Sequence, residues 1–361
     1  MTRAPKPSFS ALRARCGGGI EPMAIGELDG DNLPPTTIPP TLTLTAIGFG
    51  DPALARELGR AVIETITLLG SFMNLAKLDG VTLAVDYDAA IAGLDRGLEG
   101  LRPLDRTNTE EMQGVAMSPA VMRDGDVRTH LLFDAAMLIH LILPEASDEE
   151  RSAAIGIIAH ECAHVEITSQ KEAAIPGARF GTPIEGYERA IMFQVAEVCW
   201  DEYAACRISA PFAHQQNIQH ASTTKACLET ARVQANAAIR SYRIHGNIDR
   251  LVAEAGPPLC RPVKAAAYLL GGMDGEELGW DAFDEIRQAA ERSDYWPLFD
   301  RLHAILRDLW DGRESWSASL TTFEPLEHFA KAVFASGGLH FRSRGDGTCR
   351  IDVPFTVETI F

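Results

Sequence analysis

The chain reads Ile-Ile-Ala-His-Glu-Cys-Ala-His-Val over residues 157–165, so that His160 and His164 are four positions apart. Positions i and i+4 of an α-helix lie on one face, which lets both imidazoles point to the same place. The apolar residues around the two histidines are typical of a buried helix. Ser147 and Glu150 form a capping box upstream, which predicts where this helix begins. We therefore expect a long, largely buried helix that carries both histidines on one face.

The pattern His-Glu-x-x-His is a zinc-binding motif. Its two imidazoles can ligate one Zn²⁺ ion, and Glu161, next to the first of them, can act as general base on a zinc-bound water. Random placement of the 10 histidines among 361 residues would produce such a motif about 0.02 times per chain. The alternative is a core helix with two hydrogen-bonded histidines, but burial without partners is costly and a metal removes that cost. The motif favours a site for one zinc ion with His160 and His164 as ligands.

A catalytic zinc needs a third protein ligand, and Glu202 is the best candidate. It falls in a helix that we expect to begin at a capping box in residues 182–185 and to end before Pro211. A buried glutamate could instead pair with an arginine. Glu197 and Asp201, which we expect to be solvated, are the alternative ligands. The case for Glu202 is that it continues an apolar stripe at steps of three and four, formed by Ile191, Val195, Val198, Ala205 and Ser209.

The motif at 160–164, followed by a glutamate on a downstream helix, resembles the gluzincin branch of zinc metallopeptidases. Residues 202–211, Glu-Tyr-Ala-Ala-Cys-Arg-Ile-Ser-Ala-Pro, are similar to the Glu-x-x-Ala helix of ImmA/IrrE-like bacterial proteins. The resemblance extends over residues 115–211 and implies a zincin-like metallopeptidase core, a catalytic zinc and peptide hydrolysis. The chain departs from the family at Glu166, where zincin helices usually have an apolar residue, and it shows no helix-turn-helix partner domain.

The expected function is hydrolysis of peptide bonds by a zinc-activated water, with Glu161 passing the proton of that water to the leaving amine. The alternatives are a catalytically inactive zinc-binding regulatory or interaction protein and a zinc hydrolase of a non-peptide substrate. Retention of Glu161 favours catalysis, because a structural site needs no base. An oxyanion donor is also needed. Core or surface packing is the simpler expectation for each downstream option, namely Tyr203, Tyr242, His214, His220 and His245.

A β-hairpin is predicted upstream of the motif, because two β-prone arms flank Arg-Asp-Gly-Asp at residues 123–126. Zincin-like folds have an edge strand beside the metal, to which an extended substrate adds through backbone hydrogen bonds. Residues 115–122 or residues 127–133 could be that edge. The hairpin could equally serve only for packing, with no substrate role.

The remaining pattern predicts a mainly α fold with small antiparallel β elements, in the α+β class and with helices additional to the zincin-like core. Helical spacing covers residues 51–78 and 89–101, with a short strand at residues 81–85 between them. A second hairpin is expected at residues 339–355. Most of the chain between the two hairpins is expected to be helical, broken by proline and glycine, with the Gly-Gly pair at 271–272 ending a helix.

Four segments follow from these elements. They are a disordered or extended tail (1–40), an N-terminal α/β segment packed on the core (41–110), a zincin-like catalytic core (111–215) and a helical C-terminal part that ends in a β-hairpin (216–361).

Charge and composition exclude several classes of protein. The chain has 361 residues, 33 Lys and Arg against 50 Asp and Glu, and a formal charge of −17. That surface repels nucleic acids and anionic membranes, and it favours neutral or basic substrate segments. The basic N-terminus has no apolar run after it, so we expect no secretory signal. Seven cysteines without a CxxC pair are typical of reduced thiols. We expect a cytoplasmic protein acting on peptides or proteins, and the oligomeric state is not predicted.

Overall fold

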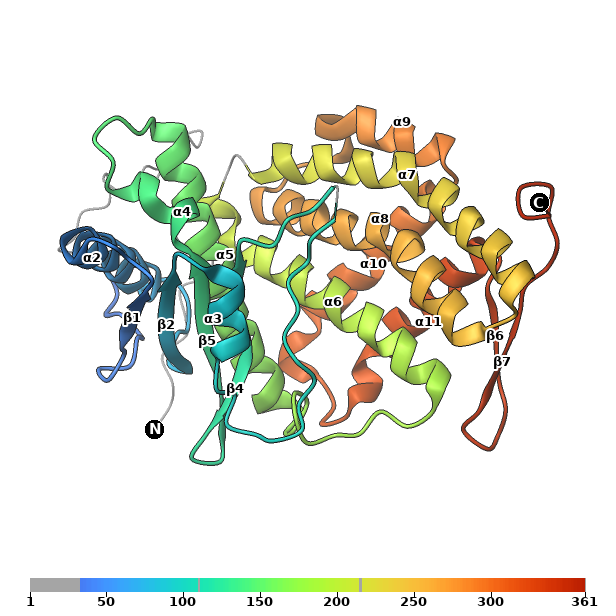
Figure 1. Cartoon of the computed structure of the whole chain (residues 1–361), viewed down its shortest axis with the longest axis horizontal. Coiled ribbons are helices and arrows are strands. Elements are labelled where there is room, and N and C mark those ends of the chain that lie inside the picture. The colour runs from blue at the N-terminus through green and yellow to red at the C-terminus, as the bar shows by residue number, and fades with distance from the viewer. Residues whose placement is uncertain (1–32, 110, 214–215, 361) are drawn as a thin grey trace. The chain divides into compact units, whose positions relative to one another are not determined.

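A mixed β-sheet and a group of packed helices lie on opposite sides of one long helix, α5 (Asp148–Ala174). The computed structural model describes residues 33–109, 111–213 and 216–360. Within them, α5 contacts strand β5 (Asp126–Asp134) on one side and helix α6 (Tyr187–Ser209) on the other (Figure 1). The motif helix therefore lies at the junction between the two halves of the fold.

The elements follow one another in a mostly helical chain, as the sequence predicts. The other strands are β1 (Leu44–Ile47), β2 (Leu78–Ala84), β3 (Ala116–Met117), β4 (Ala120–Arg123), β6 (His340–Ser343) and β7 (Cys349–Asp352). The other α-helices are α2 (Pro52–Leu69), α3 (Tyr87–Gly93), α4 (Ala135–Leu138), α7 (Gln216–His245), α8 (Ile248–Glu276), α9 (Asp284–Arg292), α10 (Trp296–Asp311) and α11 (Glu324–Ser336). The mainly helical, α+β character is confirmed.

The larger sheet is mixed, so the expectation of only antiparallel strands is wrong. Its order is β1-β2-β5-β3, with β4 also paired to β5. The β1–β2 and β2–β5 pairs are parallel, and β3 and β4 run antiparallel to β5. The parallel pairs arise because α2 separates β1 from β2 and α3 lies between β2 and β5, and such crossovers return the chain in the same direction.

Both predicted hairpins are confirmed. In the first, β4 and β5 pair across a tight turn in which Asp124 and Gly125 have φ of 53° and 80°. Two successive positive φ values match the right-handed twist of the flanking strands, which is why Asp-Gly suits this turn. In the second, β6 pairs with β7 around the predicted turn, where Gly347 has a φ of 81°.

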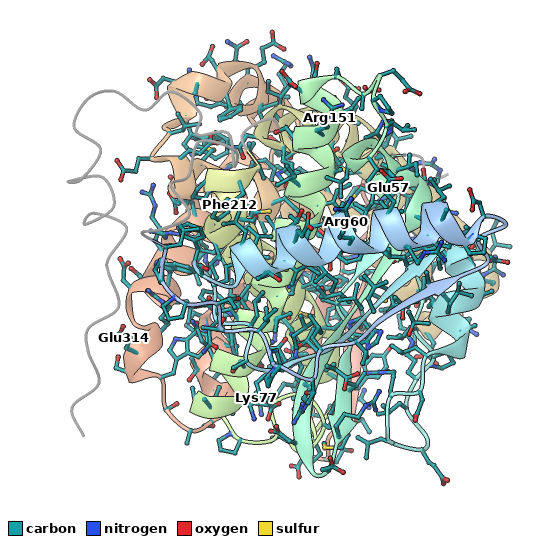
Figure 2. The ribbon with its side chains drawn as sticks, turned by 90° about the vertical axis from the view of Figure 1, so that its left-hand side faces the viewer. Glu57, Arg60, Lys77, Arg151, Phe212 and Glu314 are labelled. Carbon is teal, nitrogen blue, oxygen red and sulfur yellow. The ribbon has the colours of Figure 1, made fainter. Side chains whose placement is uncertain are left out.

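Helix α2 confirms the helical spacing of its sequence, although it ends at Leu69 rather than near residue 78. Asp51 caps it, and its buried face is formed by Leu58, Val62 and Ile66 together with its last residue. Figure 2 shows α2 facing the viewer, with the exposed side chains of Glu57 and Arg60 on its outer side. One apolar stripe thus covers the sheet while the other face of the helix meets solvent.

The helix predicted over residues 89–101 is wrong in extent. Helix α3 is only seven residues long and ends at Gly93. The chain then runs through Gly97 and Gly100, which have φ of 72° and 74°. The backbone is already extended at Leu94, where φ is −69° and ψ is 117°. A helix does not resume through left-handed residues, so residues 94–101 are irregular.

The Gly-Gly pair at 271–272 does not end a helix, which corrects the sequence interpretation. Helix α8 continues through it to Glu276, and it also contains Pro257, Pro258 and Pro262. A Cβ at Gly271 would collide with the carbonyl oxygen of Tyr203 on α6. The glycine therefore permits close approach of α8 to α6. Packing of the buried α8 outweighs the hydrogen bonds lost at the prolines.

Residues 1–32 of the predicted tail, including Cys16, lie outside the described residues. Further along, the Thr37 hydroxyl donates to the carbonyl oxygens of Gly70 (2.9 Å) and Met73 (2.7 Å) just after α2.

The six other cysteines are free thiols. Within the described ranges, no helix combines the length and apolar character required to cross a bilayer.

The close approach of α8 and α6 predicts a strong effect of one methyl group. We expect Gly271→Ala to lower the free energy of unfolding by about 2 kcal/mol, because the new Cβ must displace the α6 backbone. Urea unfolding followed by circular dichroism measures the change. Gly93→Ala is the matched control, since nothing lies within 4 Å of a Cβ there. Equal stability of the two variants would contradict the packing argument.

Candidate metal centre

Helix α5 presents His160, Glu161 and His164 as the sequence predicts, and it continues past the motif to Ala174. Its start is the predicted capping box. Glu150 donates its backbone N–H to the Ser147 hydroxyl, and the Glu150 carboxylate accepts the Ser147 N–H at 2.8 Å. The buried flanks hold the helix between sheet and α6, so the orientation of its histidines is set by core packing.

Helix α6 supplies Glu202, although it begins later than predicted. The capping box expected at residues 182–185 does not form, and the helix starts at Tyr187 after Gly186, whose φ is 86°. Within the predicted stripe, Val198 and Glu202 are half-buried and line a cleft, whereas Ala205 and Ser209 are buried. Another buried face of α6 is formed by Met192, Ala196, Cys199 and Tyr203.

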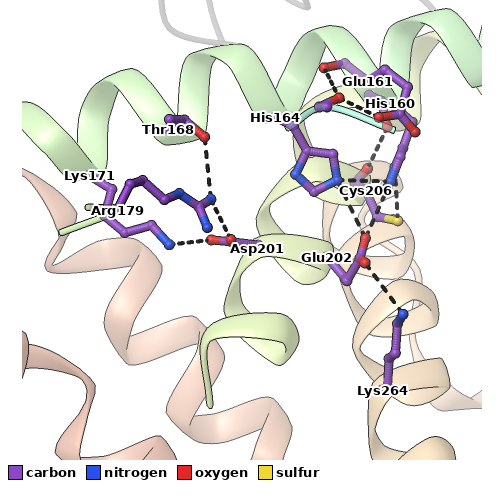
Figure 3. A network of polar contacts seen from close by, with 12 residues as sticks. His160, Glu161, His164, Thr168, Lys171, Arg179, Asp201, Glu202, Cys206 and Lys264 are labelled. Atoms are coloured by element: carbon purple, nitrogen blue, oxygen red, sulfur yellow. Dashed lines mark hydrogen bonds and ion pairs between the residues drawn. The ribbon is translucent and has the colours of Figure 1, made fainter. Parts of the chain in front are cut away.

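The three predicted ligands meet at one point (Figure 3). The Nε2 atoms of His160 and His164 are 3.1 Å apart, and Glu202 Oε2 lies 3.3 Å from the first and 3.4 Å from the second. A tetrahedral metal ion with bonds of about 2.0–2.1 Å has ligand atoms about 3.3 Å apart. The Glu202 Oε2 atom is buried, and the two imidazole nitrogens are its only polar neighbours that the described residues provide within 3.5 Å. These residues fit a zinc ion.

Glu197 and Asp201 are not solvated, which overturns the sequence expectation. Asp201 is buried and accepts hydrogen bonds from Lys171 (2.9 Å) and Arg179 (2.6 Å). Glu197 accepts from the same two cations at 3.1 Å each. Burial would raise the pKa of Asp201, but Arg179 and Lys171 hold it below the usual value. Both carboxylates are therefore engaged in ion pairs, and both are poor ligand candidates. Figure 3 shows the buried Asp201 with Lys171 and Arg179 beside Glu202.

The general-base candidate Glu161 is buried and lies against the edge of the sheet. The hydroxyl of Ser118, in the link between β3 and β4, donates to Glu161 Oε2 and lies 3.1 Å from the Glu161 carbonyl oxygen. Glu161 also lines the cleft. The side chain is thus oriented by a hydrogen bond from the sheet rather than by its own helix.

Two residues of α8, Lys264 and Tyr268, complete the site and were missed in the sequence. Lys264 Nζ lies 3.8 Å from Glu202 Oε1. The Tyr268 ring stacks on the His160 imidazole, with centroids 5.7 Å apart and planes 17° apart. A signal was present, since these two polar residues are spaced i, i+4 within the otherwise apolar run Val263–Leu270. Nothing in that spacing indicates which element the pair faces.

Of the proposed oxyanion donors in the described part of the chain, only His220 lines the cleft. Its ring lies 5.2 Å from that of Tyr268, and its buried Nδ1 has no hydrogen-bond partner among the described residues. Tyr203 instead donates its hydroxyl to Asp274 at 2.6 Å. Tyr242 and His245 contact each other edge to face, with ring centroids 5.9 Å apart and planes 77° apart. His214 lies outside the described residues.

The charges at the site are arranged around Glu202. Burial would raise the pKa of Glu202, but hydrogen bonds from His160 and His164 hold it well below the usual value. Burial, and then the nearby Glu202 charge, raise the pKa of Tyr268 well above that of a free phenol. Burial, with a contribution from His160, lowers the pKa of His220 to about 3. At neutral pH, Glu202 is thus ionised, while Tyr268 stays protonated and His220 stays neutral.

The site opens into a cleft of about 830 Å³. One wall comes from the arm Val115–Met122, which holds β3 and β4. The order of strands decides which arm of the hairpin, residues 115–122 or residues 127–133, can be an edge of the sheet. β5 pairs with β2 on one side and with β3 and β4 on the other, so residues 127–133 are central. The edge beside the cleft is therefore residues 115–122.

The departure at Glu166 has a structural explanation. Glu166 Oε2 accepts the backbone N–H of Asn74 at 2.7 Å, and Oε1 accepts from Gln170 at 2.8 Å. The carboxylate ties the end of the motif to the segment after α2, in place of an apolar contact.

No family model, no curated protein and no solved structure matches the chain.

The neighbouring carboxylates at 201 and 202 predict opposite effects of matched substitutions. We expect Glu202→Gln to weaken zinc binding about 100-fold, since it replaces a candidate ligand. Asp201→Asn should leave zinc affinity within threefold but lower the free energy of unfolding by about 3 kcal/mol, because the buried Lys171 loses a carboxylate. Zinc titration against a chromogenic chelator and urea unfolding measure the two effects. A loss of zinc affinity in Asp201→Asn alone would move the ligand assignment.

Proposed function

We propose that the chain is a zinc-dependent peptidase of the zincin type. The observation that carries the proposal is the convergence of His160 Nε2, His164 Nε2 and Glu202 Oε2 within 3.4 Å of one another. A zinc ion held by these three residues supplies the Lewis acidity that hydrolysis of a peptide carbonyl needs. The remaining chemistry belongs to the side chains around the ligands.

Glu161 is the proposed general base and acid. Its carboxylate lies on the cleft side of α5 next to the first ligand, and Ser118 orients it by a hydrogen bond. From there it takes a proton from the attacking water and delivers it to the nitrogen of the leaving amine, so that one group serves both steps. The second oxygen, Oε1, has no hydrogen-bond partner among the described residues and is free to hold the water.

Tyr268 and His220 are the proposed donors to the oxyanion. The raised pKa of Tyr268 keeps its hydroxyl protonated, and the lowered pKa of His220 keeps its ring neutral with one N–H. Both residues line the cleft beside His160. Donors that are already in place stabilise developing negative charge without the cost of reorganising solvent.

Two features favour catalysis over a purely structural or regulatory zinc site. Structural sites are usually closed by four protein ligands. Here, in the part of the chain that the structure describes, only three His, Cys, Asp or Glu donors converge. The nearest thiol, Cys206 Sγ, lies 3.7 Å from the Nδ1 atom of His160, on the ring nitrogen that does not face the other ligands. All three candidate ligands line the cleft, where a substrate could reach a bound ion. The strand edge along that cleft favours an extended peptide over a compact substrate.

Substitutions in the motif separate metal binding from turnover. We expect Glu161→Gln to retain one zinc ion per chain and to lose hydrolysis of a peptide library by at least 10³-fold, because the base is absent but all ligands remain. His160→Ala should lose both zinc and turnover. Zinc content is measured by atomic absorption and turnover by mass spectrometry of the library. Wild-type protein that binds no zinc, or zinc-loaded protein with no turnover, would refute the proposal.

The hydroxyl of Tyr268 is expected to act in the transition state. Tyr268→Phe should lower kcat about 10²-fold with little change in KM, as for other single oxyanion donors. Tyr203→Phe is the matched control, because that hydroxyl is bonded to Asp274 and does not line the cleft. Steady-state kinetics on one peptide that the wild type cleaves give both constants. An unchanged kcat in Tyr268→Phe would leave His220 as the candidate donor.

A further inference from the structure

Arg96 differs from the other cations that line the cleft. Lys264, Arg106 and Arg179 each lie within ion-pair distance of a carboxylate. No carboxylate that the structure describes lies within ion-pair distance of Arg96 or accepts a hydrogen bond from it. Its side chain is only partly exposed, and burial lowers the pKa of its guanidinium. The cleft thus contains one arginine whose charge the described part of the protein leaves uncompensated.

The fold holds Arg96 firmly at the edge of the sheet. Its carbonyl oxygen accepts the N–H of Met122 on β4 at 2.8 Å, so the backbone follows the outer side of that strand. Gly97 makes this approach possible, since its φ is 72° and a Cβ there would collide with the Met122 carbonyl oxygen. The position of the residue is therefore set by a backbone hydrogen bond to β4.

The guanidinium is also fixed. Its Nε donates to the Ala120 carbonyl oxygen at 3.3 Å, its Nη1 donates to the Arg102 carbonyl oxygen at 3.2 Å, and its carbon lies 5.6 Å from the centre of the Phe180 ring. These are neutral contacts, and they leave Nη2 without a hydrogen-bond partner in the described ranges. A guanidinium that neutral groups hold in one orientation is preorganised to bind an anion.

Its distance from the chemistry follows from the same strand. Ser118 contacts Glu161, and Ala120, which contacts Arg96, is two residues further along. At about 3.3 Å per residue, the two contacts are about 7 Å apart. Because Arg96 itself occupies the outward backbone groups of Ala120 and Met122, the edge open to an extended peptide is residues 115–119. A peptide paired there would bring a group two residues from the cleaved bond to Arg96.

We propose that Arg96 is a specificity determinant that binds a carboxylate of the substrate about two residues from the cleaved bond. The inference rests on the proposed peptidase function. The carboxylate can be an acidic side chain or the C-terminal carboxylate of the peptide. The overall charge of −17 repels acidic peptides at long range, whereas Arg96 attracts one carboxylate at contact distance, so the preference is confined to one position.

Paired peptides test the proposal. In a peptide that the wild type cleaves, Glu replaces Gln at one position at a time, from three residues before to three after the cleaved bond, with the C-terminus amidated. The second set has Gln at all of these positions and ends two residues after the cleaved bond. Its members differ only in whether the C-terminus is a free carboxylate or an amide. We expect kcat/KM to rise about tenfold for a carboxylate at one position only. The set that shows the rise identifies the source of the carboxylate.

Variants assign that preference to Arg96. Arg96→Gln should reduce the Glu-to-Gln ratio from about 10 to about 1, and Arg96→Lys, which keeps the charge but not the fork of N–H groups, should give about 3. The control is Arg60→Gln on α2, an exposed arginine that has no side-chain partner among the described residues and does not line the cleft, and it should retain the ratio of 10. A wild type with no preference, or a preference that persists in Arg96→Gln, would overturn the proposal.

A binding experiment separates this inference from the proposed function. Fluorescence anisotropy of the same labelled peptides with zinc-loaded Glu161→Gln protein reports affinity without turnover. We expect the carboxylate peptide to bind about tenfold more tightly, and this difference to disappear in the Glu161→Gln, Arg96→Gln double variant. If no peptide is cleaved but this difference is observed, the peptidase proposal fails and the anion site stands. If peptides are cleaved and the difference is absent, only the anion site fails.

Discussion

The contact between α5 and α6 is the constraint on which the site depends. It brings two imidazole nitrogens and a carboxylate oxygen to 3.1–3.4 Å of one another in a partly buried place. Three lone-pair donors at that spacing are unfavourable unless a proton or a cation lies between them. Protonation of His164 supplies part of this compensation, since Glu202 raises its pKa against the effect of burial. A metal ion would supply it for all three donors at once.

The rest of the fold keeps that contact in place. Beside Glu202, Lys171 of α5 and Arg179 of the segment after it bind both Glu197 and Asp201 of α6, so a partly buried network of opposite charges connects the two helices. Breaking such a network costs more than forming it gains, so its main effect is to exclude other registers of the two helices. From the other side, α8 approaches α6 at Gly271 and contributes Lys264 and Tyr268 to the site. The metal centre thus depends on three helices whose separations are set outside it.

The sheet forms the side of the cleft along which we propose that a substrate binds. Because β5 is paired on both sides, the arm from Val115 to Met122 is left as the edge along the cleft. In that arm, Ser118 donates a hydrogen bond to Glu161, and the carbonyl oxygen of Ala120 accepts one from Arg96. The geometry of the arm therefore sets the distance between the proposed base and the proposed anion site. A rigid strand is a more accurate spacer than a loop, because each residue adds a nearly constant rise.

The local signals in the sequence determined the helix of the His-Glu-x-x-His motif, its capping box, both hairpins and three of the residues that meet at the site. These depend on spacing within a few residues, which fixes which side chains share a face. The parallel sheet, the burial of Asp201, the continuous α8 and the roles of Tyr268 and Arg96 were decided only by the tertiary structure. Each depends on which distant element packs against a face. Asp201 was expected to be solvated because the sequence does not show that Lys171 and Arg179 lie opposite it. The pattern along one helix identifies a polar residue, but the neighbouring helix decides whether that residue becomes a ligand, an ion pair or a solvated group.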